Sequence, residues 1–541
     1  MAILPKLLPA ALLGAHTALA GSGDPPPGSN PISWGFYASK ETLEPTELEI
    51  EGTIPSWLTG SLYRGASGTW DAGNYTSEHW FDGFSRNHRF EIANGQVTYR
   101  SRNSSDEVID FVEETGLYPG GNFGGDPCKL IFGAFEVNYR DGVNPRGDKS
   151  SSTVVVSFVP NFVSLDANAT YEDDDTAPFH NLVATTDGNE LQQINPNTLE
   201  PIELFTYQAF NDLLVNGARS AAHPVSSRGG PIFNYVLDLE EEEPTYRVFR
   251  IDPTGETSVI ANITDAPPAY IHSVFSTENY IIMVIWQADF THKDRTVLSS
   301  LGEWDPERNT LFYIIDRFNG GIVAKYEAPD TFFAFHEANS FEEDNGDIVI
   351  DLPVLEDYAF LFNAKLEFLR ENVLEYNATS RHDVAGSLTR YRLPYHKPSN
   401  CSNGTLTTRP AEKVWSLPFD GANIELPRIN PDYKGKSHRY VYGVHVETKG
   451  HFIDSIVKID AQDQTWKVWE PRARSVPSEP IFVKRPGSVN EDDGVLLTVA
   501  MDSEQKHSSL VILDAQTMTE IGRAKTPVVV GYGFHGTWGS R

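Results

Sequence analysis

Residues Leu191–Ile202 read Leu-Gln-Gln-Ile-Asn-Pro-Asn-Thr-Leu-Glu-Pro-Ile, a short strand pattern followed by a polar turn and a second strand. Residues Val248–Val259 read Val-Phe-Arg-Ile-Asp-Pro-Thr-Gly-Glu-Thr-Ser-Val and have the same layout. Asn, Asp, Pro and Gly stand where a turn needs a fixed or positive φ, and β-branched or aromatic residues flank them. Each stretch therefore predicts a β-hairpin.

The hairpin unit returns along the whole chain, at residues 311–328, 456–468 and 510–524. Little helix pattern lies between the copies, and no linker follows the Pro-rich segment at 24–31. This distribution favours an all-β β-propeller over a row of β-sandwiches, which would need linkers between modules of roughly 100 residues. We expect one propeller domain over residues 34–541, preceded by a flexible Pro/Gly-rich segment at 21–33.

The composition excludes several classes of protein. The 541 residues include 75 Asp and Glu against 43 Lys and Arg, a formal charge of −32 at neutral pH. A nucleic-acid binder needs a surplus of Lys and Arg, so no nucleic-acid partner is expected. Hydrophobic residues at 40% and charged residues at 22% are typical of a globular protein and not of a disordered or fibrous chain.

The N-terminus has the layout of a cleaved secretory signal at residues 1–20. Lys6 precedes the apolar run Leu7–Ala15, and the small residues Ala18 and Ala20 end the segment. Asn-x-Ser/Thr sequons follow at Asn74, Asn103, Asn168, Asn262, Asn377, Asn400 and Asn403, a modest excess over the about four expected by chance. The sequence thus favours a secreted glycoprotein, with an intracellular protein peripheral to a membrane as the alternative.

Several common chemistries lack the residues that they need. Cys128 and Cys401 are the two cysteines, so one disulfide bridge is the most that can form, and no Cys-rich zinc or iron–sulfur site is expected. The sequence also has no Gly-rich phosphate loop and no Gly-x-Ser-x-Gly elbow in a strand-to-helix context. Histidine remains as the candidate for chemistry.

Four of the 15 histidines lie at the edges of apolar, strand-like runs, namely His223, His272, His336 and His535. An inward, neutral imidazole needs a partner for each nitrogen, and a metal ion is one such partner. For any one of them alone, a hydrogen-bonded core histidine is the alternative. Because the intervals are 49, 64 and 199 residues, a shared site requires a propeller, in which the inner strands converge on the axis.

Short motifs are spread from about Trp34 to Arg541. Besides the four histidine contexts, they are Gly60–Gly65, His79–Gly83, His88–Phe90, Asp126–Cys128, Glu425–Asn430, Pro477–Phe482 and Glu491–Gly494. Together they resemble the motifs of the carotenoid cleavage oxygenases, a family that includes stilbene-cleaving enzymes and the retinoid isomerase of the visual cycle. Their number and order make the resemblance highly specific. Among them, His79–Gly83 is expected to support the fold rather than the chemistry.

The resemblance implies a seven-bladed propeller with an axial metal site and a cap of loops and short helices over one face. It implies one non-haem Fe(II) per chain, held by His223, His272, His336 and His535. In the family, three outer Glu residues accept the free N–H of three ligands. Glu425 and Glu479 match two of these residues, and Asp187 stands at the third position, where a shorter side chain must approach by a backbone shift or through water, or leave its histidine unsupported.

The resemblance further implies a dioxygenase that cleaves a C=C bond of a small, apolar, conjugated substrate with O₂ and gives two carbonyl products. A peripheral membrane contact would serve substrate uptake. Stilbene-cleaving relatives use a Lys just before the third outer carboxylate, and Thr186 at this position favours a carotenoid or apocarotenoid. A secretory route favours a stilbene or another phenolic alkene, which stays an alternative. A second alternative is a secreted binding propeller that has lost catalysis.

Overall fold

The computed structural model describes residues 31–540 together with Pro25 and Ser29, apart from residues 38, 121, 132–148, 166–175, 215–216, 228, 240–242, 292–293, 295, 372–383, 395–405, 449–450 and 473–474. Several predictions fall outside the described residues. They concern the signal at 1–20, most of the segment 21–33, the pairing of Cys401, and the sequons Asn168, Asn377, Asn400 and Asn403.

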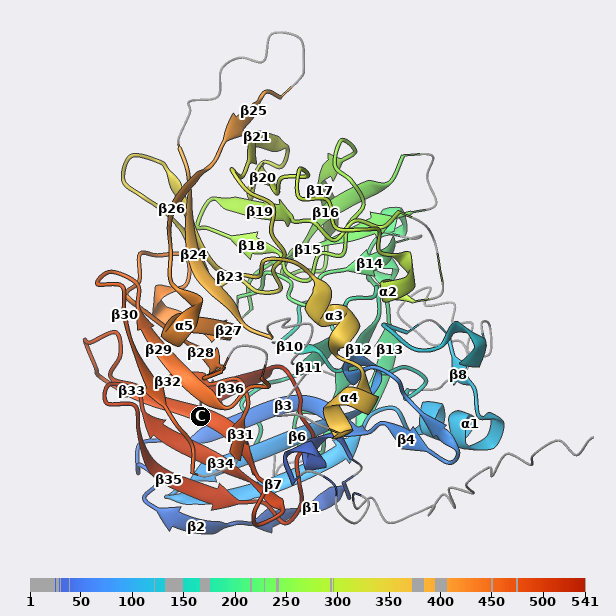
Figure 1. Ribbon diagram of the computed structural model, residues 1–541, viewed down its shortest axis with the longest axis vertical. Coiled ribbons are helices and arrows are strands. Elements are labelled where there is room, and N and C mark those ends of the chain that lie inside the picture. The colour runs from blue at the N-terminus through green and yellow to red at the C-terminus, as the bar shows by residue number, and fades with distance from the viewer. Residues whose placement is uncertain are drawn as a thin grey trace, which may run out of the picture.

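The described part of the chain is mostly β-structure, as predicted, and its longer strands form six sheets (Figure 1). The first sheet, in spatial order, contains β1 (Thr42–Glu47), β7 (Gln96–Asn103), β6 (Phe84–Ala93), β3 (Gly60–Thr69) and β36 (Gly536–Ser540). The second contains β10 (Ser157–Pro160), β11 (Leu182–Thr185), β12 (Leu191–Ile194) and β13 (Pro201–Phe205). The third contains β14 (Gly217–Ser220), β15 (Ile232–Asp238), β16 (Thr245–Ile251) and β17 (Thr257–Ile263).

The other three sheets come from the second half of the chain, with one strand from its start. The fourth contains β18 (Phe275–Ser276), β19 (Tyr280–Ile285), β20 (Leu311–Asp316), β21 (Ile322–Glu327) and β25 (Thr408–Pro410). The fifth contains β22 (Asn339–Glu342), β23 (Ile348–Val354), β24 (Gly386–Leu393), β26 (Glu412–Ser416), β27 (Asn423–Arg428), β28 (Tyr440–His445), β29 (Ser455–Asp460) and β30 (Thr465–Trp469). The sixth contains β2 (Glu49–Gly52), β35 (Thr519–Lys525), β34 (His507–Asp514), β33 (Gly494–Asp502), β31 (Ser475–Pro477) and β32 (Ile481–Lys484).

The hairpins predicted from turn chemistry are confirmed. They are β12–β13, β16–β17, β20–β21, β29–β30 and β34–β35, and all are antiparallel. The turn between β20 and β21 passes through Gly320 and Gly321 at φ values of 73° and 87°, a conformation that glycine adopts without strain. In β19 the run Ile281–Ile285 is fully buried, because such a strand has neighbouring layers on both of its faces.

The two ends of the chain join the same arrangement of sheets. The last strand, β36, pairs with β3 from Gly60↔Ser540 to Arg64↔Gly536, and β2 pairs with β35. Strands from both ends therefore lie side by side in the lower part of Figure 1. Closure of a propeller ring would pair strands from the two ends of the chain in this way. The eight-stranded sheet divides at β24 and β27, which two residue pairs join, and the count of seven blades stays a prediction.

The described α-helices are few and short. They are α1 (Asp106–Thr115), α2 (Val297–Ser300), α3 (Ala359–Asn363), α4 (Leu366–Glu371) and α5 (Phe419–Ala422). None of the helices in the described ranges is long and apolar enough to cross a membrane. Arg370 of α4 donates to the backbone oxygen of Phe36, and Phe360 of α3 lines the cavity described below. A short helix thus borders the cavity, and the cap of loops and short helices stays a prediction.

Candidate metal centre

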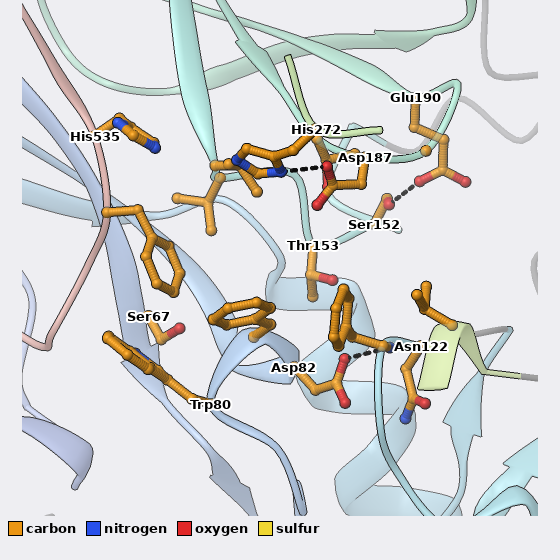
Figure 2. A pocket seen from close by; sticks show the side chains of 18 of the residues that line it. Ser67, Trp80, Asp82, Asn122, Ser152, Thr153, Asp187, Glu190, His272 and His535 are labelled. Atoms are coloured by element: carbon orange, nitrogen blue, oxygen red, sulfur yellow. Dashed lines mark hydrogen bonds and ion pairs between the residues drawn. The ribbon is translucent and has the colours of Figure 1, made fainter. Parts of the chain in front are cut away.

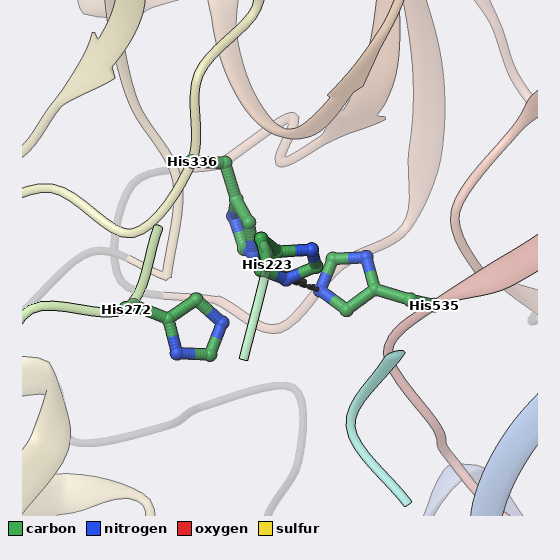
Figure 3. Close-up of side chains that lie close together, drawn as sticks. All are labelled: His223, His272, His336 and His535. Atoms are coloured by element: carbon green, nitrogen blue, oxygen red, sulfur yellow. Dashed lines mark hydrogen bonds between the residues drawn. The ribbon is translucent and has the colours of Figure 1, made fainter. Parts of the chain in front are cut away.

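Four imidazoles from distant parts of the chain converge on one point (Figure 3). His223 follows β14, while His272, His336 and His535 stand just before β18, β22 and β36. The Nε2 atom of His535 lies 3.0 Å from that of His223 and 3.0 Å from that of His336. One nitrogen of each ring lies within 4.8 Å of the others. The structure therefore brings together the four histidines singled out in the sequence.

The four rings are largely withdrawn from solvent. His272, His336 and His535 are buried, and His223 is half-buried. Burial lowers the pKa of His535 well below its ordinary value, and the neighbouring His336 lowers it further. Burial likewise lowers the pKa of His223, with His535 as the next cause. These two rings are therefore neutral near pH 7, which is the form of histidine that binds a metal.

Three of the four rings have a carboxylate at Nδ1. The Nδ1 atom of His336 lies 2.6 Å from Glu425, and that of His535 lies 2.8 Å from Glu479. The Nδ1 atom of His272 lies 2.6 Å from Asp187. The three carboxylates singled out in the sequence thus each contact a different histidine of the cluster.

The donor set fits a divalent first-row metal. A proton held on Nδ1 by a carboxylate leaves the lone pair on Nε2, so the close Nε2 atoms of His336 and His535 would both present lone pairs. Two lone pairs 3.0 Å apart repel unless a cation lies between them. This separation is also what two nitrogens make when each binds one ion at about 2.1 Å and a right angle.

Asp187 reaches its histidine directly, with no bridging group. Its Oδ1 atom faces His272, and its Oδ2 atom accepts a hydrogen bond of 3.0 Å from the Tyr270 hydroxyl. The backbone N–H of Ser220 donates to the Asp187 carbonyl, which fixes the loop beside β14. Tyr270 thus orients the shorter acid toward the ring.

We expect Tyr270→Phe to weaken metal affinity roughly ten-fold, because the Asp187 carboxylate loses the donor that orients it. Asp187→Glu should leave affinity unchanged or improve it. Metal titration of the apoprotein measures both effects. Tyr391→Phe is the matched control, since its hydroxyl donates to the Asp330 carboxylate instead and its side chain is buried. Unchanged affinity in Tyr270→Phe would remove this positioning role, and a large loss in Asp187→Glu would show a site built around the shorter acid.

The two glutamates differ in their surroundings. Glu479 accepts from Nε of Arg428 at 2.7 Å through Oε1 and from the backbone N–H of Gly536 at 2.8 Å through Oε2. Buried Arg64 lies 3.7 Å from the same Oε2 atom. Glu425 accepts from the backbone N–H of Leu426, and its Oε1 atom is buried without a partner among the described residues. Glu479 therefore balances two cations as well as an imidazole.

Glu425→Gln and Glu479→Gln should each weaken metal affinity or activity by roughly ten- to a hundred-fold, because an amide oxygen accepts the imidazole N–H more weakly than a carboxylate. Glu479→Gln should in addition lower the free energy of unfolding of the apoprotein by about 3–5 kcal/mol, since it leaves buried Arg64 without its countercharge. Denaturant unfolding of the two apoproteins separates these effects. Equal stability of the two variants would contradict the second expectation.

Two cavities meet at the histidine cluster. The first, of about 430 Å³, is lined by His272, His336 and His535 and by aromatic rings that include Trp80, Phe81, Phe335, Phe360 and Phe534 (Figure 2). The second, of about 530 Å³, is lined by His223, His336 and His535 and by polar residues such as Ser227, Glu278 and Lys436. Ser227, Glu278 and Lys436 are exposed. A bound metal would have the aromatic wall of the first cavity on one side and the polar, solvent-facing second cavity on the other.

The motif at His79 supports the fold, in agreement with the sequence analysis. His79 is buried, accepts from the backbone N–H of Phe81 through Nδ1 and donates through Nε2 to the Leu361 carbonyl. Burial lowers the pKa of His79 to about 4. Asp82 accepts from the backbone N–H groups of Phe123 and Gly124. The neighbouring aromatic residues of the motif nevertheless line the first cavity, which the sequence analysis did not foresee.

The chain matches the family model described as retinal pigment epithelial membrane protein over residues 35–540. It is 33% identical to a carotenoid dioxygenase of Neurospora crassa, with 94% of this chain and 90% of the relative covered. It is 32% identical to a torulene dioxygenase of Gibberella fujikuroi, with 93% of each chain covered. It is 30% identical to the mitochondrial carotenoid-cleaving dioxygenase of Homo sapiens, with 90% of this chain and 87% of the relative covered.

Solved structures share the fold. A cobalt-substituted apocarotenoid oxygenase of Synechocystis superposes with a TM-score of 0.70 at 23% identity, covering 95% of this chain and 99% of that one. The fold of the present chain and its similarity to named dioxygenases define this chain as an oxygenase. The chain belongs to the carotenoid cleavage oxygenase family.

Proposed function

We propose that this protein is a non-haem Fe(II) dioxygenase that cleaves one C=C bond of a carotenoid or apocarotenoid with O₂. One O₂ is consumed for each double bond broken, and both oxygen atoms leave in the two carbonyl products. The observation that carries the proposal is the convergence of four imidazoles, with one nitrogen of each within 4.8 Å of the others, at the end of an aromatic cavity. The similarity to a carotenoid dioxygenase, a torulene dioxygenase and a carotenoid-cleaving dioxygenase supports the substrate class.

His223, His272, His336 and His535 would hold one Fe(II) per chain. When bound, the iron would supply the binding and activation of O₂. Glu425, Glu479 and Asp187 keep a proton on Nδ1 of three rings and fix their orientation. The cobalt-substituted relative supports a divalent metal in this fold.

The walls of the first cavity determine what can react. Phe335 stands edge-on to His272, with ring centroids 5.5 Å apart, and Phe81 lies between Phe335 and Phe534 at 6.4 and 5.0 Å. Flat aromatic walls suit a flat polyene and exclude water, so a double bond can lie beside the histidine cluster without competing hydration. The protein therefore contributes metal placement, substrate position and a water-poor site, with little acid–base chemistry.

Thr186 lines the first cavity next to Asp187, so no ammonium group stands where the stilbene-cleaving relatives place one. With Fe(II)-loaded protein, we expect cleavage of an apocarotenal and none of a hydroxystilbene under the same conditions. Product analysis and O₂ uptake measure both, and metal-free protein is the control. Thr186→Lys alone should not create stilbene activity, because a phenol needs more than one partner. Efficient cleavage of the stilbene by the unaltered protein would favour the phenolic alternative.

The other alternative is a binding propeller without catalysis. The complete quartet and its three carboxylate contacts argue against it, because a binding module has no use for four oriented imidazoles. Metal analysis discriminates between the two. No iron after anaerobic reconstitution with Fe(II) would support the binding module, and about one iron per chain would support the enzyme.

We also propose that the protein forms a single seven-bladed domain over residues 34–541 and follows the secretory route, with a peripheral membrane contact for substrate uptake. The sequons Asn74 and Asn262 are exposed, as N-glycosylation requires. A mobility shift after glycosidase treatment of protein from its native source would support this route.

A further inference from the structure

The first cavity carries a positive charge that the metal centre does not use. Arg219 of β14 lines this cavity, and its backbone pairs with Gly188, next to Asp187. Within the described ranges, the guanidinium of Arg219 makes no hydrogen bond and no ion pair, and its neighbour is the Phe290 ring, with a centroid 5.9 Å away. A guanidinium presents five N–H donors. Arg219 is half-buried, so its free donors are open to the first cavity.

The acids near Arg219 are already engaged. The carboxylate of Asp187 accepts from His272 and Tyr270, and that of Glu190 accepts from the Ser152 hydroxyl. Burial lowers the pKa of Arg219, while Asp187 raises it again, and an arginine so placed keeps its charge near neutral pH. Glu190 and Ser152 lie on the opposite side of the view from His535 in Figure 2. The cavity thus has an aromatic part and a polar part.

Substrate binding changes which groups can accept hydrogen bonds from Arg219. A polyene that fills the cavity displaces water, and the Arg219 donors then need an acceptor on the substrate. A carbonyl oxygen at the end of an apocarotenoid supplies one, whereas a hydrocarbon end leaves the guanidinium desolvated and unpaired. Sites that leave a buried polar group unpaired reject the wrong substrate strongly.

We propose that Arg219 binds the carbonyl oxygen of an apocarotenoid end group and makes the protein selective for carbonyl-terminated substrates over hydrocarbon carotenes. This inference rests on the proposed function. It places the reaction after an earlier oxidative cleavage, because breaking a C=C bond of a carotene with O₂ is the class of reaction that generates such a carbonyl end. Asp187 and Glu190 place two negative charges beside the single positive charge of Arg219, which disfavours a carboxylate end and suits a neutral aldehyde.

The test compares kcat/KM for an apocarotenal and for a hydrocarbon carotene in the Fe(II)-loaded protein. Arg219→Leu should lower the aldehyde-to-hydrocarbon ratio by roughly ten- to a hundred-fold, as expected for a hydrogen bond to a charged group. Arg219→Lys should retain part of the ratio. Arg317→Leu is the matched control, because Arg317 is also stacked on a phenylalanine ring, Phe233, at 5.0 Å but lines the second cavity.

Each outcome decides the inference. A ratio that stays constant while both substrates lose activity equally would show that Arg219 acts through Asp187 and would overturn the proposal. Arg219-dependent cleavage of a hydroxystilbene but not of the apocarotenal would reassign the donor to a phenol. If the unaltered protein cleaves neither substrate, the proposed function fails. Quenching of protein fluorescence by the apocarotenal in metal-free protein then decides the inference alone, since weaker binding in Arg219→Leu supports it and equal binding overturns it.

Discussion

Deletion of Phe534–Arg541 should lower the stability of the apoprotein far more than His535→Ala does. The deletion removes β36 and exposes β3 as an unpaired edge, so five residue pairs are lost from Gly60↔Ser540 to Arg64↔Gly536. It also removes the Phe534 ring, 4.8 Å from Trp80 and 5.0 Å from Phe81 between centroids. At about 1 kcal/mol for each net hydrogen bond, with the ring burial added, the loss is on the order of 5 kcal/mol or more.

Thermal unfolding of the metal-free proteins measures this difference, because metal binding would otherwise add its own contribution. Phe534→Ala removes the ring and keeps the strand, so its melting temperature should lie between those of the deletion variant and of His535→Ala. Phe534 and Trp538 are only partly buried, so neither ring alone accounts for the loss. Equal melting temperatures for the deletion and His535→Ala would show that the last strand does not close the arrangement of sheets.

Replacement of any one of His223, His272, His336 and His535 by Ala should remove bound iron and activity and leave a folded protein. The sheets are already packed around the site, so metal binding is not the main source of stability. His223→Ala should disturb the fold least, since His223 is half-buried and no carboxylate contact at its ring is present among the described residues. Iron content and circular dichroism of the purified variants measure both effects.

His438→Ala is the matched control for this series. His438 is also buried, and its Nε2 atom lies 3.3 Å from the Asp351 carboxylate, but it is not a member of the cluster. The His438→Ala variant should be less stable than the unaltered protein and should keep its iron. Full iron content and turnover in any one variant of the quartet would take that histidine out of the ligand set.

The sequence predicted the parts of the fold that depend on local chemistry. The hairpin at Leu191–Ile202 could be recognised because Asn195, Pro196 and Asn197 make a turn whatever surrounds them, and β12 and β13 pair as expected. The histidine contexts were also visible locally, since each imidazole follows or precedes buried apolar residues. The convergence of the four histidines could not be predicted from local sequence, because His336 and His535 are 199 residues apart and meet only through the whole arrangement of sheets.

Contacts between distant segments account for what the sequence left open. The sequence left three possibilities for Asp187, namely a backbone shift, a bridging water or an unsupported histidine. The direct contact with His272 depends on how the loop after β11 packs against β14. Tyr270 had a usable signal, since residues two apart in an extended chain share a face, and its hydroxyl does reach the partner of His272. Arg219 had no such signal, because its place in the cavity follows from the pairing with Gly188.

The most direct measurement is anomalous diffraction at the iron edge from crystals grown after anaerobic reconstitution with Fe(II). We expect one anomalous peak per chain, at about 2.1 Å from one nitrogen of each of His223, His272, His336 and His535. A peak bound elsewhere, or no peak at the point where the four imidazoles converge, would contradict the assignment of this site as the metal centre.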